Sequence, residues 1–270
     1  MKKTAIFITI VLILFLSSCD SFFSKSLGSF REYDPAKINV TAANVDEWIR
    51  ASVGNPALAK AVYEAIQREL KKPSVPDKPA LREAGLRLAI ISSGLGELIL
   101  TDGAAIFKDI DFDNIEDPEE LVKEILDAII NGFESYGGSD AADAITDLLA
   151  GVMNDPDDDD YDYPKFDGTA ESFTAGDVAE AILILVLAEL SRIMADVDDF
   201  FDEWDGSVDN LGIGLGFKDG HVVIDGDPSD NAPTLAAYLN LIIEDKDGKF
   251  DDNPLTRAIK DALLSGMNNP

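Results

Sequence analysis

The sequence predicts a mainly all-α protein, either an irregular multi-helix bundle or an array of helical hairpins, with one small β-hairpin near residues 211–225. Two observations carry this prediction. After residue 44, apolar residues recur three and four positions apart through most of the chain, which is the period of an amphipathic helix. Residues 211–217 instead alternate glycine with apolar residues, which is typical of a strand. The segments with the helical period are 45–51, 56–70, 81–100, 118–133, 140–153, 175–201, 233–244 and 254–265.

Three of these helices begin with the same two kinds of residue. Asn55-Pro56, Asp117-Pro118 and Asn253-Pro254 each place a side-chain acceptor before a proline. The acceptor can cap a free backbone N–H group, and proline is favoured at the first helical position, where its missing N–H is not needed. The starts are unevenly spaced, so they indicate shared capping chemistry and not a sequence repeat.

The predicted helix at 81–100 has a middle made of small residues, Ser92-Ser93-Gly94-Leu95-Gly96. Two interpretations remain open here. Either a second helix crosses closely over the small residues, or the helix is interrupted.

The longest apolar stretch, residues 181–188, lies between Glu180 and Glu189 in the predicted helix at 175–201. A helix that is apolar on nearly all sides is expected to be surrounded by other helices, so we predict that it is the central helix of the fold. Eight apolar residues between two glutamates are too few to cross a membrane, which takes about 20.

The predicted hairpin runs through Lys218-Asp219-Gly220 into a second extended segment at 221–225. A period of two puts Gly212, Gly214 and Gly216 on one side of the first strand, where an aromatic ring or another backbone segment could pack closely. The G-x-G-x-G spacing lacks the βαβ context of a nucleotide-binding fingerprint. We therefore expect a structural hairpin at one end of the helices.

The N-terminus has the layout of a secretory signal: Lys2 and Lys3, then the apolar run 5–16, then Leu16-Ser17-Ser18-Cys19. The closing tetrapeptide resembles the lipobox of bacterial lipoproteins. This resemblance implies that signal peptidase II cuts before Cys19 and that Cys19 carries lipid. Cys19 is also the only cysteine of the chain. The alternative is a free cysteine at the end of an ordinary signal peptide or membrane anchor.

The resemblance implies a protein that is anchored to a membrane of the bacterial cell envelope and faces the periplasm or the cell exterior. Asp20, which follows the lipobox cysteine, retains lipoproteins on the inner membrane in some bacteria, and the choice of membrane stays open. The predicted organisation is a signal peptide at 1–18, a lipidated N-terminus and tether at 19–44, and a helical domain at 45–270.

The charge of the chain limits its partners. Residues 1–18 contain two of the 22 basic residues and none of the 52 acidic ones, so the remainder carries a net charge of −32. Nucleic acids and anionic lipid surfaces attract clustered Lys and Arg, so neither is an expected partner. Hydrophobic residues make up 46% of the chain, which is enough to form a folded core. With one cysteine, that core forms without internal disulfides.

Acidic residues at two places suggest calcium. Counting from Asp109, acids fall at positions 1, 3, 5, 9 and 12, which resembles the ligand spacing of an EF-hand loop. Asn114, Glu116 and Pro118 depart from the family pattern. The competing interpretation is a capping box that opens a helix at residues 117–120. The candidate ligands are Asp109, Asp111, Asp113, Asp117 and Glu120.

A weaker calcium candidate consists of Asp245, Asp247 and Asp251, which surround Gly248. These residues resemble the middle of an EF-hand loop. Ile243 and Pro254 would occupy the first and last ligand positions, so a complete EF-hand is not expected there. A turn between two helices explains the same residues.

The chain shows few signs of catalysis. His221 is the only histidine, and neither a G-x-S-x-G motif nor a Walker motif is present. We therefore expect a non-enzymatic, membrane-anchored lipoprotein of binding or scaffold type that takes a protein partner or an apolar ligand. One alternative is a calcium-dependent binding or adhesion module that uses the aspartate loops. The second is a hydrolase that uses paired carboxylates.

Overall fold

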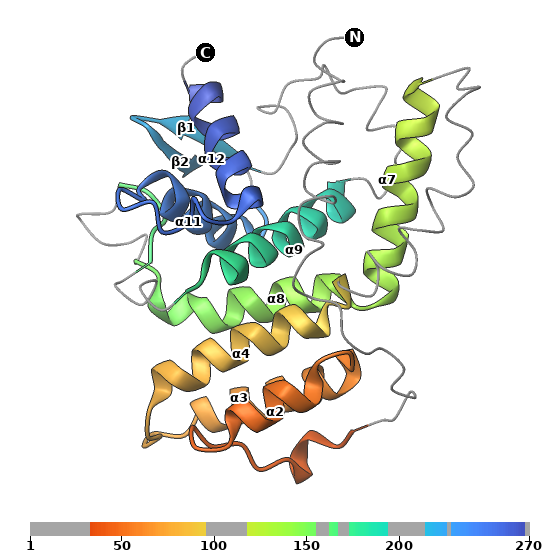
Figure 1. Ribbon diagram of the computed structural model, residues 1–270, viewed down its shortest axis with the longest axis vertical. Coiled ribbons are helices and arrows are strands. Elements are labelled where there is room, and N and C mark those ends of the chain that lie inside the picture. Colours follow the sequence, from red (N-terminus) through yellow and green to blue (C-terminus); the bar gives the residue numbers. More distant parts are fainter. Residues whose placement is uncertain are drawn as a thin grey trace.

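The computed structural model describes residues 33–95, 118–154, 162–166, 173–193, 214–225 and 228–267. In these segments the chain forms eight α-helices and one two-stranded antiparallel sheet, which confirms the mainly all-α prediction (Figure 1). The elements are α2 (Val45–Ser52), α3 (Pro56–Leu70), α4 (Lys78–Ser92), α7 (Pro118–Ser135), α8 (Gly138–Leu149), α9 (Ala175–Ile193), β1 (Leu215–Lys218), β2 (His221–Ile224), α11 (Ala232–Ile243) and α12 (Pro254–Met267), with short 3-10 turns at Pro35–Lys37 and Ala150–Val152.

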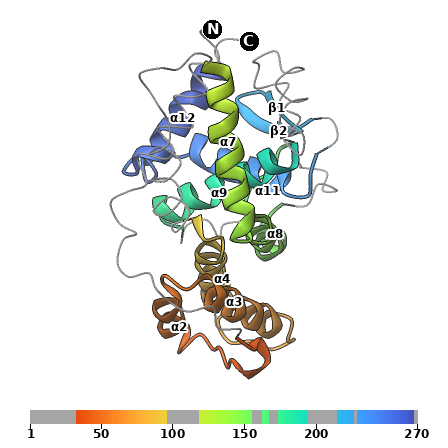
Figure 2. The ribbon, with the colours of Figure 1, turned by 90° about the vertical axis from the view of Figure 1, so that its right-hand side faces the viewer.

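Helices α3, α4, α8 and α9 are stacked one on another along the longest axis of the molecule, whereas α7 and α12 run steeply along that axis (Figures 1 and 2). Helix α3 packs on α4, α4 on α8, α8 on α9, and α9 on α11. Helix α2 lies against α3 and α4, whereas α7 contacts α8 and α9. The sheet packs on α11 through β2. The consecutive pairs α3–α4, α7–α8 and α11–α12 are in contact as helical hairpins.

Helix α9 is central, as predicted. Its apolar residues are buried on most sides, and it contacts α4, α7, α8, α11 and α12. The part of the predicted helix at 194–201 lies outside the described residues.

None of the described helices is both long enough and apolar enough to cross a membrane.

Two predicted asparagine caps form as expected. The Oδ1 atom of Asn55 accepts a hydrogen bond from the amide of Leu58 at 3.1 Å. The Oδ1 atom of Asn253 accepts one from the amide of Leu255 at 2.8 Å. In both helices the proline follows directly, so side-chain capping and the preset φ of proline act together. Helix α7 also begins at its predicted proline, Pro118.

Helix α4 differs from the prediction at both ends. It begins at Lys78, because Asp77 caps it by accepting a hydrogen bond from the amide of Ala80 at 3.4 Å. It ends at Ser92, so the expectation of one helix through residue 100 is wrong. Gly94 has a φ of +62°, and a Cβ atom added there would lie 2.5 Å from the Cβ of Tyr136. Of the two interpretations of the small residues, the interrupted helix is correct, because the left-handed backbone conformation of Gly94 ends α4.

The hairpin is confirmed. Strand β1 pairs with β2 in a register that places Lys218 opposite His221. Asp219 and Gly220 both have positive φ, 52° and 83°, which is the geometry of a two-residue type I′ turn. A Cβ atom added to Gly214, which directly precedes β1, would lie 2.6 Å from the Cα of Pro228, so a backbone segment does pack closely on one of the predicted strand's glycines.

Candidate functional site

The turn between α11 and α12 holds the sequence-predicted site residues whose side chains the structure describes, namely Asp245, Asp247 and Asp251. Cys19 and the acids at 109–117 lie outside the described residues. Glu120 is in α7, but its side chain is also outside this description. The geometry of the stronger calcium candidate therefore stays a prediction.

Asp245 closes the first half of the turn. Its Oδ1 accepts a hydrogen bond from the amide of Lys249 at 3.0 Å, and its Oδ2 accepts one from the amide of Phe250 at 2.9 Å. Only 4% of its side chain is exposed. Gly248 takes a φ of +72°, which lets the chain reverse beneath this carboxylate. Phe250 is buried and anchors the turn in the core.

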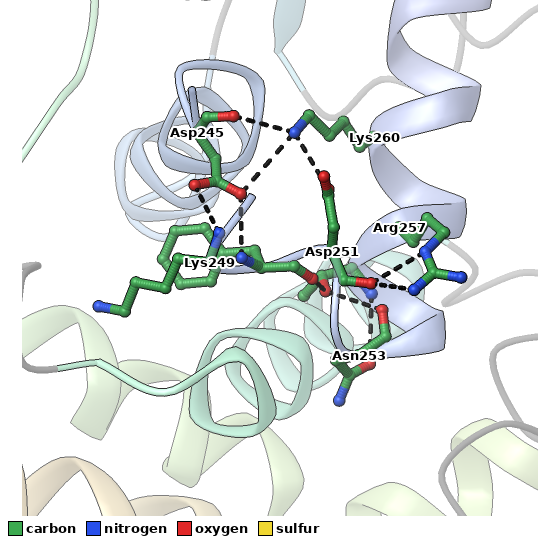
Figure 3. A network of polar contacts seen from close by, with 8 residues as sticks. Asp245, Lys249, Asp251, Asn253, Arg257 and Lys260 are labelled. Atoms are coloured by element: carbon green, nitrogen blue, oxygen red, sulfur yellow. Dashed lines mark hydrogen bonds and ion pairs between the residues drawn. The ribbon is translucent and has the colours of Figure 1, made fainter. Parts of the chain in front are cut away.

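Lys260, from α12, brings its ammonium group to this turn (Figure 3). Its Nζ donates to the carbonyl oxygen of Asp245 at 3.0 Å and to Oδ1 of Asp251 at 3.1 Å. The Oδ2 of Asp245 lies 3.7 Å from the same nitrogen. The two candidate aspartates thus meet, and a lysine lies between them.

The second half of the turn is held by residues at the start of α12. Arg257 donates from its Nε to the carbonyl oxygen of Asp251 at 2.9 Å (Figure 3). The hydroxyl of Thr256 donates to the carbonyl oxygen of Phe250. With the Asn253 cap, these contacts hold the second half of the turn against the start of α12.

Asp247 is exposed and takes no part in this network. Calcium in proteins is held by six to eight oxygen ligands. Among the described residues, no group of three or more His, Cys, Asp or Glu side chains is arranged to hold a metal ion. In this turn the structure instead shows two carboxylates paired with a lysine.

The histidine lies in a second polar group, which joins the hairpin to α11. The His221 ring stacks on Tyr163, with ring centroids 3.8 Å apart, and its Nε2 is 3.4 Å from an oxygen of Glu244. The Tyr163 hydroxyl donates to that same carboxylate. Burial and this hydrogen bond raise the pKa of Tyr163 to about 12. These contacts pair the histidine structurally with a tyrosine and an acid.

Asn240 is a fully buried amide in α11. Its Oδ1 accepts a hydrogen bond from the amide of Val222 at 2.7 Å, and its Nδ2 donates to the carbonyl oxygens of Val222 and Pro164 at 2.8 and 2.9 Å. One side chain thereby holds β2 and the segment at 162–166 against the same helix.

Glu189 is a carboxylate with a side chain only 1% exposed, at the end of the apolar run of α9. Its Oε2 accepts hydrogen bonds from Nε of Arg192 at 3.2 Å and from a terminal guanidinium nitrogen at 3.1 Å. Its other oxygen accepts from the hydroxyl of Ser229. The buried charge is thus paired and hydrogen-bonded, as burial requires.

Glu180, one turn beyond Asp177 in α9, has a raised pKa, whereas Glu189 is paired with Arg192. Burial, with a smaller contribution from the Asp177 charge, raises the pKa of Glu180 to about 7. Asp177 itself pairs with Arg87 of α4 at 3.5 Å, and Arg87 also pairs with Glu83 at 3.0 Å. The Tyr238 hydroxyl is also buried, and it has no hydrogen-bond partner in the described part of the chain.

Sequence reasoning missed most of these partners. Lys260 is 15 residues from Asp245, and Tyr163 is 81 residues from Glu244. A signal did exist for Asn240, which is the one side-chain amide in the mainly apolar α11, and for Glu189, which directly follows the apolar run at 181–188. Such residues are buried only with partners, although the pattern does not name the partner.

Comparisons with protein-family models, with curated proteins and with solved structures found no match to this chain. Its function is therefore inferred from its own residues.

Proposed function

We propose that the chain is an exported lipoprotein that is anchored to a bacterial membrane through lipid on Cys19, and that its helical domain is a binding or scaffold module, not an enzyme. The N-terminal pattern carries this proposal. A basic start, a short apolar run and Leu16-Ser17-Ser18-Cys19 occur in the order that lipoprotein maturation requires, and the cysteine is the only one in the chain.

The described polar groups support the second half of the proposal. The turn at Asp245, the histidine group and the Glu189 pair each use their charges to join helices or loops to one another. A catalytic site would instead be expected to direct such groups toward an open pocket where a substrate can bind. A protein partner or an apolar ligand remains the proposed target.

Anchoring is tested by expressing the full chain and Cys19→Ala in a bacterium that is fed an alkyne-tagged fatty acid. The expected result is label on the wild type, with partition into the detergent phase, and neither for the variant. Equal labelling of both chains, or an unlabelled wild-type chain, would overturn the anchoring proposal.

The binding role is tested separately by crosslinking in intact cells, followed by purification of the full chain from membranes. The control is an unrelated acidic lipoprotein at the same level. A discrete crosslinked species specific to this chain supports the proposal. Turnover of a hydrolase substrate panel by the purified chain, lost when one carboxylate pair is neutralised, would contradict it.

A further inference from the structure

We propose that the ammonium group of Lys260 is the cation of the α11–α12 turn, so that this turn closes around a charge from its own chain and not around a divalent metal ion. The proposal concerns the described turn alone and does not depend on lipid anchoring. It starts from the position of Lys260 between two sequence-predicted metal ligands, Asp245 and Asp251 (Figure 3).

The buried Asp245 carboxylate needs a positive charge close to it. The Asp245 carboxylate is almost entirely removed from solvent, and both of its oxygens accept backbone hydrogen bonds. A buried carboxylate is stable only when hydrogen bonds and an opposite charge replace its hydration. Lys260, with 16% of its side chain exposed, provides that charge.

The oxygens around the Lys260 ammonium group lie at distances that suit an ammonium and not a calcium ion. Two oxygens, the carbonyl of Asp245 and Oδ1 of Asp251, accept hydrogen bonds from this ammonium group, and a third, Oδ2 of Asp245, forms an ion pair with it at 3.7 Å. The Nζ–O distances of 3.0 and 3.1 Å are those of N–H···O hydrogen bonds. Calcium–oxygen distances are about 2.3–2.6 Å, so a metal ion would draw these oxygens closer together.

The contact between Lys260 and Asp245 connects α12 to the end of α11. Lys260 lies in α12, whereas Asp245 is the second residue after α11, so the ammonium ties the second helix to the start of the turn. A bound metal ion would join α12 to the turn only above a threshold concentration of that ion. A lysine is part of the chain and joins them at every metal concentration.

Amide hydrogen exchange of the full chain, purified in a non-ionic detergent, tests the proposal at the atoms concerned. The probes are the amides of Lys249 and Phe250, which donate to Asp245. Lys260→Met is compared with Lys246→Met, because Lys246 is an exposed lysine in the same turn. We expect exchange about tenfold faster in K260M and unchanged in K246M, since a charge-assisted contact is lost only in the first.

Two further measurements keep the result interpretable. Amides of α9 should exchange as in the wild type, which shows that K260M is folded. Asp251→Asn keeps the lysine but removes one of its charged partners, and an intermediate rate is expected. Equal rates in K260M and K246M would overturn the proposal, as would calcium, but not magnesium, slowing the Lys249 and Phe250 amides of the wild type.

Discussion

The side-chain amide of Asn240 pairs with Val222 as the backbone of a neighbouring strand would. Its oxygen accepts from the Val222 amide at 2.7 Å, and its nitrogen donates back to the Val222 carbonyl at 2.8 Å. A two-stranded hairpin is marginal by itself in water. This pairing gives β2 a partner on its outer edge and fixes the hairpin to α11.

Asn240→Asp keeps the acceptor for Val222 but removes both donors and buries a charge. We expect the free energy of unfolding to fall by about 2–4 kcal/mol, because two carbonyl groups lose their partner. Urea unfolding of the full chain followed by circular dichroism measures it. Asn44→Asp is the matched control, because the half-buried Asn44 makes one comparable donation, to the Asn39 carbonyl. Equal losses in the two variants would show that the pairing is energetically unimportant.

The ion pair of Glu189 and Arg192 predicts an asymmetric result. Arg192→Met leaves a buried carboxylate with Ser229 as its remaining side-chain donor, and we expect a loss of about 2–3 kcal/mol. The double variant Glu189→Met, Arg192→Met removes the stranded charge and should recover part of that loss. Lys72→Met, in the more exposed pair with Glu69, should change stability by less than about 1 kcal/mol. A double variant less stable than R192M contradicts this account.

Glu180 predicts a pH dependence of stability. Its pKa is about 7 in the folded chain against an ordinary value of 4.5, so the folded state holds the proton more tightly than the unfolded state. Its protonated form favours folding at low pH, and this contribution is lost as pH rises from about 4.5 through about 7. The difference corresponds to at most about 3 kcal/mol.

Glu180→Gln should therefore stabilise the chain at pH 8 and change little at pH 4. Thermal melts at both values measure the difference, and Glu64→Gln, at an exposed glutamate of α3, controls for the removal of one negative charge. A gain for E180Q that is the same at both pH values, or no larger than the gain for E64Q, would refute the prediction.

Gly94 and Gly220 form a matched pair for backbone strain. Both have positive φ, +62° and +83°, but a Cβ at Gly94 would overlap Tyr136, whereas nothing lies within 4 Å of one at Gly220. Gly220→Ala should cost about 1–2 kcal/mol from the left-handed backbone alone. Gly94→Ala should cost about 3 kcal/mol or more, because Tyr136 must also move. Denaturant midpoints measure both, and equal losses would argue against the close contact with Tyr136.

The calcium prediction at Asp109, Asp111, Asp113, Asp117 and Glu120 is tested by melting the full chain in chelator and then in rising calcium. Calcium at 100 times its dissociation constant would add about 2.7 kcal/mol, which is a shift of several degrees. The shift should disappear in Asp111→Asn, Asp113→Asn. If magnesium or salt shifts the melt equally, these acids are a solvated surface.

The helical period and the Asn-Pro starts were sufficient to predict α3 and α12, because both are local signals. The hairpin followed from the alternation at 211–217 and the glycine turn at Lys218-Asp219-Gly220, which are local signals as well. The end of α4 was left open, because the close approach of Tyr136 to Gly94, which leaves no room for a Cβ atom, joins residues that are remote in sequence. Local pattern does not include such contacts.

The polar groups were harder to predict for the same reason. Asp245, Asp247 and Asp251 form the weaker calcium candidate of the sequence, and the structure brings Asp245 and Asp251 together but not Asp247. Sequence spacing, however, does not show that the cation is Lys260, because that depends on how α12 packs. The Glu244–Tyr163 and Asn240–Pro164 contacts likewise join segments more than 70 residues apart.

Helix α11 has a consequence for how the molecule opens. Within the helix, Asn240 is hydrogen-bonded to β2 and to Pro164. Just beyond its last residue, Glu244 contacts Tyr163 and His221. The next residue, Asp245, accepts a hydrogen bond from Lys260. The hairpin, the 162–166 segment and α12 are therefore coupled through one helix. Because stability is divided into cooperative units, these segments should open together, as a single unit distinct from the α3–α4 pair at the other end of the stack.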